Sequence, residues 1–140
     1  MAEYCIGTAQ FGMPYGIANK AGQPALHQIN EIVKCAIENN IRYFDTAQSY
    51  RESEQLLGES LIKLPGDNKT RIISKLSPDI QNNETKFIID SVKSSLNKLN
   101  IESLYGFLAH RVESFKSDPY IDAVKFLKNN GLIIKSGVSV

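Results

Sequence analysis

Short apolar runs alternate with longer amphipathic stretches along this chain. The runs are rich in β-branched and aromatic residues and are too short to form helices, so they favour β-strands. They lie at residues 4–8, 42–46, 71–75, 103–109 and 132–138. Because an amphipathic stretch separates each run from the next, the pattern predicts an α/β fold in which strands and helices alternate as (βα)4β.

The amphipathic stretches have the spacing of helices that pack one face against a sheet. The first predicted helix ends at Asn39 and Asn40, and the others cover residues 53–64, 84–99 and 119–130. In the first helix the apolar residues recur every three or four positions and form one stripe, which consists of Ile29, Ile32, Val33, Ala36 and Ile37.

Four residues with reactive side chains end or follow the predicted strands. Asp45 lies at the end of the second run, and Tyr50 follows that run. Lys75 ends the third run, and His110 follows the fourth. The carboxyl ends of parallel strands share one face of an α/β protein, so residues distant in sequence converge there. The sequence therefore predicts a site that combines a carboxylate, a phenol, an amine and an imidazole.

The glycines after the first run do not match a phosphate-binding loop. A dinucleotide-binding fingerprint needs a second glycine two residues after the first, and a P-loop needs lysine after its last glycine. Here Gly12 lies five residues after Gly7 and is followed by Met13. The connection over residues 9–24 is long for a compact domain, which favours a loop that lines a pocket.

Composition and charge exclude several classes of protein. A chain of 140 residues with 42% hydrophobic residues is large enough for one domain with a core. The net charge of +1 gives no electrostatic basis for binding nucleic acid. No signal-peptide pattern and no run of ~18 apolar residues occurs, so we expect a cytoplasmic protein without a membrane partner. Cys5 and Cys35 match neither a CxxC pair nor a zinc site, so we expect two buried core thiols and no metal.

Several short motifs, taken in order, resemble those of the aldo-keto reductases. The resemblance covers nearly the whole chain, and it implies a (β/α)8 TIM-barrel fold that binds NADP(H). Residues 1–140 would then be the N-terminal part of a single barrel domain, with its first five strands. The matching segments are Gly7-Thr8-Ala9, Asp45-Thr46-Ala47, Tyr50, Ser53-Glu54, Leu57-Gly58, Ser74-Lys75, Ala109-His110-Arg111 and Gly137-Val138-Ser139.

The chemistry of carbonyl reduction explains why these residue types would share a site. When hydride reaches the carbonyl carbon, negative charge develops on oxygen, and a positioned proton donor lowers the barrier. Tyr50 would be this donor, and the charge of Lys75 would stabilise the phenolate that remains. Asp45 would hold the lysine protonated, and His110 would orient the carbonyl and relay a proton.

The family resemblance also implies the ligands. Cofactor contacts would come from Gly7, Thr8, Asp45 and Ser139. The opening segment from Gly7 to Ile17 is similar to bacterial aldo-keto-reductase-like proteins associated with surface-sugar synthesis. A small carbonyl or sugar-like substrate would follow from this similarity.

Two positions depart from the family pattern. Arg51 follows the tyrosine where the family usually has glycine, so a positive φ there would be strained. Val140 follows Ser139 where many members have an asparagine that contacts the nicotinamide amide.

Length is the larger departure. A complete barrel needs roughly 250 residues, so 140 residues with five predicted strands form an incomplete barrel. The main binding region for the cofactor pyrophosphate and 2′-phosphate would be missing. We therefore expect residues 1–140 to show little reductase activity and weak NADP(H) binding. The open barrel would need a cover, which a homo-oligomer could provide.

Three other interpretations fit the same sequence. Lys75 could form a Schiff base with a carbonyl substrate, as in a class I aldolase. The chain could instead be a non-catalytic fragment or interaction module. Five strands and four helices also fit an open flavodoxin-like sheet.

Overall fold

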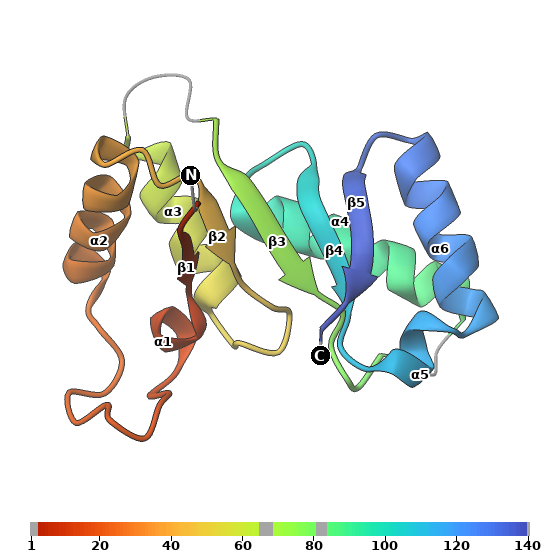
Figure 1. The fold of residues 1–140 in the computed structure, drawn as a ribbon, viewed down its shortest axis with the longest axis horizontal. Helices are drawn as coiled ribbons and strands as arrows, with labels where there is room; N and C mark the ends of the chain where they lie inside the picture. The colour runs from red at the N-terminus through yellow and green to blue at the C-terminus, as the bar shows by residue number, and fades with distance from the viewer. Residues whose placement is uncertain (1–2, 65–68, 81–83, 140) are drawn as a thin grey trace.

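The computed structural model describes residues 3–64, 69–80 and 84–139. The strands, all parallel, form one sheet in the order β1-β2-β3-β4-β5 (Figure 1). A flavodoxin-like sheet has the order 2-1-3-4-5, so the flavodoxin-like interpretation is wrong. The strands are β1 (Cys5–Gly7), β2 (Tyr43–Asp45), β3 (Arg71–Lys75), β4 (Leu104–Ala109) and β5 (Ile133–Val138).

Among the described residues, four long helices separate the strands, as the apolar periodicity predicts. Two further helices of four residues each, α1 and α5, were not predicted, because one turn is too short to show a helical period. The helices are α1 (Ala9–Gly12), α2 (Leu26–Glu38), α3 (Ser53–Ile62), α4 (Thr85–Leu99), α5 (Val112–Phe115) and α6 (Asp118–Asn129). None of the described helices is long and apolar enough to cross a membrane.

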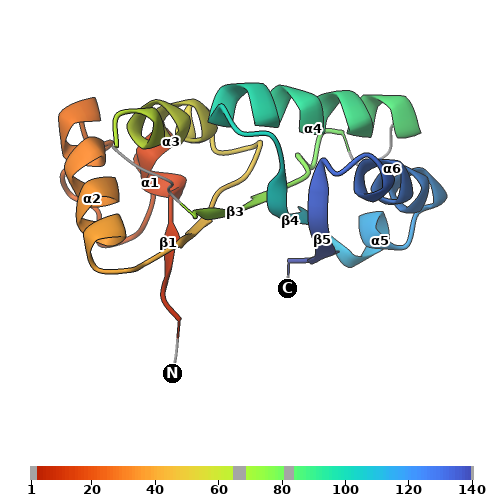
Figure 2. The same ribbon diagram turned by 90° about the horizontal axis from the view of Figure 1, so that it is seen from above.

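The long helices cover one face of the sheet and leave the other open. Seen from above, α2, α3, α4 and α6 lie on the same side of the strands, and no described helix lies on the opposite side (Figure 2). Sequential parallel strands with helices on the outer face are the architecture of a (β/α)8 barrel, here present as a (βα)4β portion. The open face corresponds to the barrel interior.

One apolar core fills the space between the sheet and the helices. Phe44, Ile72 and Phe107 of the sheet are at most 2% exposed, and the helices contribute side chains that are completely buried. Burial of this apolar area is the main favourable term that holds the helices on the sheet. The completely buried helix residues include Ile29, Val33, Leu57, Ile88, Val92, Ala123 and Leu127.

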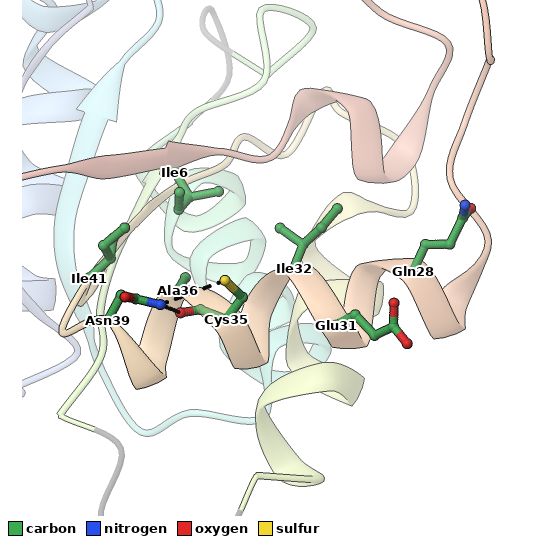
Figure 3. A pocket seen from close by; sticks show the side chains of 8 residues that line it. All are labelled: Ile6, Gln28, Glu31, Ile32, Cys35, Ala36, Asn39 and Ile41. Atoms are coloured by element: carbon green, nitrogen blue, oxygen red, sulfur yellow. Dashed lines mark hydrogen bonds between the residues drawn. The ribbon is translucent and has the colours of Figure 1, made fainter.

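Both cysteines are exposed, so the prediction of core thiols is wrong. Ile6 points towards α2, and side chains alternate along a strand, so Cys5 points to the open face of the sheet (Figure 3). Cys35 borders a groove of about 790 Å³ between α2 and the edge strand β1. Ile32 also lines this groove and is 41% exposed. An edge strand has no neighbour on one side, so this flank of the helix stripe stays uncovered.

Candidate active site

Asp45 and Lys75 form a partly buried ion pair at the ends of β2 and β3. The Lys75 Nζ atom lies 2.6 and 2.7 Å from the two carboxylate oxygens of Asp45, and 2.9 Å from the carbonyl oxygen of Thr46. The Lys75 side chain is 7% exposed and that of Asp45 is 32% exposed. Three acceptors thus surround an ammonium that has three N–H donors, which fixes its position.

Tyr50 lies beside this ion pair. The loop after β2 returns the chain so that the centre of the Tyr50 ring is 5.2 Å from Lys75 Nζ. This distance is within the range of cation–π contacts. The structure therefore brings together three of the four residues that the sequence singled out: the carboxylate, the amine and the phenol.

Gln48 anchors the Tyr50 loop to two other parts of the protein. Its Nε2 atom donates to the hydroxyls of Ser91 and Ser95 on α4, at 3.1 and 3.2 Å. Its Oε1 atom accepts from the backbone N–H of Ser77 at 2.9 Å, and its own N–H donates to the Lys75 carbonyl at 3.1 Å. Gln48 therefore couples the tyrosine loop to the segment that carries the lysine.

Close contact between α1 and the same loop also positions Tyr50. A Cβ atom at Gly12 would lie 1.8 Å from the Tyr50 carbonyl oxygen, so only glycine fits there. Arg51 has a φ of 50°, which confirms the strained conformation that the missing glycine implied. Such a left-handed residue costs roughly 1–2 kcal/mol. Sequence reasoning missed the positioning roles of Gln48 and Gly12, because both depend on neighbours that only the fold supplies.

Three buried hydroxyls connect the ends of β1 and β2 with the start of α3. The Thr8 hydroxyl donates to the Asp45 carbonyl at 3.0 Å and lies 2.8 Å from the Ser53 hydroxyl, which also contacts Thr46 at 3.1 Å. All three residues are completely buried. The Thr8 side chain therefore holds the backbone of Asp45, and a contact between this hydroxyl and a cofactor would require the cluster to open.

Glu54 provides a second anchor beneath the ion pair. Its side chain is 1% exposed, and it accepts a hydrogen bond of 2.7 Å from the Ser74 hydroxyl, next to Lys75. A buried carboxylate needs such a partner. Glu54 thus ties α3 to β3 on the helix side of the sheet, while Lys75 faces the site.

His110 follows β4 on the same edge of the sheet but forms no hydrogen bond or ion pair with the other three residues in the described structure. Its Nδ1 atom is buried and has no hydrogen-bond partner there. The Ser139 N–H donates to the Ala109 carbonyl at 2.9 Å, which places Ser139 beside His110. Gly7 pairs in register with Asp45 and leaves open space beside it. Val140 lies outside the described residues.

The charge of Asp45 also acts on Cys5. Partial desolvation, and then the negative charge of Asp45, raise the pKa of the Cys5 thiol, while Lys75 lowers it. A raised pKa means less thiolate at a given pH. We expect the alkylation rate of Cys5 to reach half its maximum above the ordinary thiol pKa of about 8.5. Peptide mass spectrometry over a pH series would measure this midpoint.

Asp45→Asn provides the control for this expectation, because it removes one cause of the shift. The midpoint for Cys5 should fall in this variant, while the rate at the distant Cys35 should not change. An unchanged Cys5 midpoint would contradict the placement of Asp45 beside Cys5.

Comparison with known proteins shows the family to which this chain belongs. The model of the aldo/keto reductase family matches residues 3–140. A candidate aldo-keto reductase from Pseudomonas aeruginosa has a TM-score of 0.81 and 25% identity over 96% of this chain and 54% of its own. No curated protein sequence gives a significant match.

Two other solved structures share the fold. An aldo-keto reductase from Bacillus halodurans in its holo form has a TM-score of 0.76 and 22% identity, covering 98% of this chain and 45% of its own. A glycerol dehydrogenase from Gluconobacter oxydans has a TM-score of 0.73 and 23% identity, covering 96% and 43%. This chain thus spans about half the length of the solved structures that it resembles. Its own residues 3–140 match the family model, and it belongs to the aldo/keto reductase family.

Proposed function

We propose that this protein is an NADP(H)-dependent oxidoreductase that interconverts a small carbonyl compound and its alcohol, with Tyr50 as the proton donor. The observation that carries the proposal is the position of the Lys75 ammonium, bound by Asp45 and 5.2 Å from the Tyr50 ring. A fixed positive charge beside a phenol stabilises the phenolate that remains after proton transfer.

Each residue then has a defined part in the reaction. Tyr50 protonates the developing alkoxide, and Lys75 stabilises the resulting phenolate. Asp45 keeps the ammonium in place. His110 orients the carbonyl through its other ring nitrogen, Nε2, because it follows β4 at the same edge of the sheet, whereas its Nδ1 atom is buried.

The residues at the strand ends are compatible with a nicotinamide ring. Gly7 has no side chain and leaves open space beside Asp45, and Ser139 directly follows β5 on the same edge. Bound NADPH would supply the hydride. For the substrate we infer a small carbonyl or sugar-like compound, in line with the glycerol dehydrogenase of the same fold.

The contacts of Lys75 disfavour the Schiff-base alternative. A nucleophilic amine must be neutral and must present a lone pair to the substrate. Lys75 Nζ instead has three oxygen acceptors within 2.9 Å, which matches a protonated ammonium.

Turnover and trapping experiments together test the proposed function. The absorbance of NADPH should fall with small aldehydes or sugar-like carbonyls, and borohydride treatment with substrate should leave Lys75 unmodified. Because one face of the described sheet is open, we expect residues 1–140 alone to turn over slowly and to bind NADP(H) weakly. A borohydride-stable adduct on Lys75 would favour the aldolase-type reaction instead.

We propose that two copies of this chain form a homo-oligomer that completes the open barrel. The edge strand β1 of one copy would pair with the edge strand β5 of the other. Unpaired strand edges readily pair with another strand. Face-to-face contact is disfavoured because it would bring the exposed cations Arg71 and Lys135 of both copies together. A specific interface of this kind should bury more than ~1,000 Å², and sedimentation velocity should show a dimer. A monomer at all concentrations would contradict this.

A further inference from the structure

A second group of polar side chains crosses the open face at the amino ends of the strands, away from the candidate active site. Arg71 and Lys75 lie on the same face of β3, and at about 3.3 Å per residue they are roughly 13 Å apart along the strand. Each of β2 to β5 contributes one member, and Glu3 comes from the segment just before β1. We name this group the basal row, and it consists of Glu3, Tyr43, Arg71, Tyr105 and Lys135.

The two cations of the basal row are held by phenols. The Arg71 guanidinium lies 5.1 Å from the centre of the Tyr43 ring and 5.3 Å from that of Tyr105, and it donates a hydrogen bond to the Tyr43 hydroxyl. Lys135 Nζ lies 5.1 Å from the centre of the Tyr105 ring. The two rings meet edge to face at 5.5 Å. The rings thus hold both cations in place, while the Lys135 ammonium and the Arg71 guanidinium stay accessible to solvent.

Hydrogen bonds within the row shift the pKa values of Tyr105 and of the two cations. The bonds with Lys135 and then with Tyr43 lower the pKa of Tyr105. The same contact with Tyr105 raises the pKa of Lys135, and the hydrogen bond with Tyr43 raises that of Arg71. Both cations therefore stay charged at neutral pH, against one carboxylate, that of Glu3.

A cavity of about 780 Å³ adjoins the basal row at the amino ends of β1, β2 and β3. Glu3, Tyr43 and Arg71 line it, together with Arg42 and Lys69. Arg42 is fixed, because its guanidinium donates to the Ile37 carbonyl at 2.7 Å and to Asn40 Oδ1 at 3.1 Å. Three cations and one carboxylate thus border the cavity.

We propose that this cavity binds a small oxyanion, a carboxylate or a phosphate. Arginine N–H groups match the oxygens of such anions in geometry and charge, and charge-assisted hydrogen bonds are the strong ones. The hydroxyls of the tyrosines that line the cavity add neutral donors. The site is distinct from the candidate active site, because it lies at the opposite ends of the same strands.

The anion could be free in solution or belong to a carboxylate of a second copy, and the chemistry of recognition is the same. Protein concentration distinguishes the two sources. A free anion binds with an affinity that does not depend on protein concentration. A carboxylate of a second copy competes with added phosphate, so the apparent affinity for phosphate falls as the protein becomes more concentrated.

Titration of the chain with inorganic phosphate tests the proposal. NMR signals of the Arg71 side chain and of the Tyr43 and Tyr105 rings should shift and saturate, with a dissociation constant of about 1–10 mM at low ionic strength. A matched chloride titration corrects for ionic strength. Shifts that grow linearly without saturation, or that chloride reproduces, would overturn the proposal.

Two variants and a matched control locate the site. Arg71→Gln should weaken phosphate binding about tenfold or more, because it removes a charged donor. Lys69→Gln changes an exposed residue of the cavity rim, so it tests the site even if Arg71→Gln does not fold, and it should weaken binding severalfold. Lys93→Gln makes the same charge change on the exposed side of α4 and should leave the affinity within about twofold. Equal affinities in Lys69→Gln and Lys93→Gln would overturn the proposal, whatever the outcome for Tyr50.

Discussion

Tyr50→Phe is expected to lower kcat at least about 100-fold in any form of the protein that reduces a carbonyl with NADPH. The substitution removes one oxygen atom and with it the proposed proton donor, while the ring that contacts Lys75 remains. General acid catalysis is typically worth 10²–10⁴-fold, and a 100-fold loss corresponds to about 2.7 kcal/mol of transition-state stabilisation. Steady-state kinetics with a fixed aldehyde measures the effect.

The affinity for NADPH should change little in the same variant, because the hydroxyl acts in proton transfer and not in cofactor binding. Tyr15→Phe offers a matched control, since Tyr15 is exposed and lies outside the candidate active site. It should retain the rate of the original protein. Retention of more than about a tenth of the rate by Tyr50→Phe would contradict its role as proton donor.

Lys75→Met is expected to cause the largest loss of stability among single changes at the site. It leaves the Asp45 carboxylate without its cation and removes the donor to the Thr46 carbonyl. Removing one partner of a fully buried ion pair costs about 3–5 kcal/mol. Because the Asp45 side chain is 32% exposed, water screens part of its charge, and we expect about 2 kcal/mol. Urea unfolding followed by circular dichroism would measure the loss.

Two further variants separate the two causes of the stability loss in Lys75→Met, which are the lost charge and the changed shape of the side chain. The double variant Asp45→Asn, Lys75→Met removes both charges and should recover part of the lost stability, because no unpaired carboxylate remains. Lys86→Met breaks an exposed ion pair with Asp90 on α4 and should change stability little. If Lys75→Met proved as mild as Lys86→Met, the ion pair at the site would have no special energetic role.

Local sequence patterns were sufficient to predict the strands and long helices, and to predict that Asp45, Tyr50 and Lys75 lie together in the candidate active site. Strand and helix periods depend on neighbouring residues, so the five strands and four long helices could be predicted. Asp45 and Lys75 could be placed together because parallel strands in sequential order bring their carboxyl ends to one edge. The pattern could not reveal that both cysteines are exposed. Their exposure depends on an edge strand and an uncovered sheet face, not on their own neighbours.

The sequence by itself determined the alternation of strands and helices, the family motifs and the identity of the polar residues at the strand ends. Only the tertiary structure decided how the Tyr50 loop is held, because Gly12, Gln48 and the α4 serines meet it from distant parts of the chain. It also decided that the basal row forms one group, since strand pairing brings together residues that are up to 132 positions apart, from Glu3 to Lys135. Such contacts follow from register and packing, which no local pattern in the sequence records.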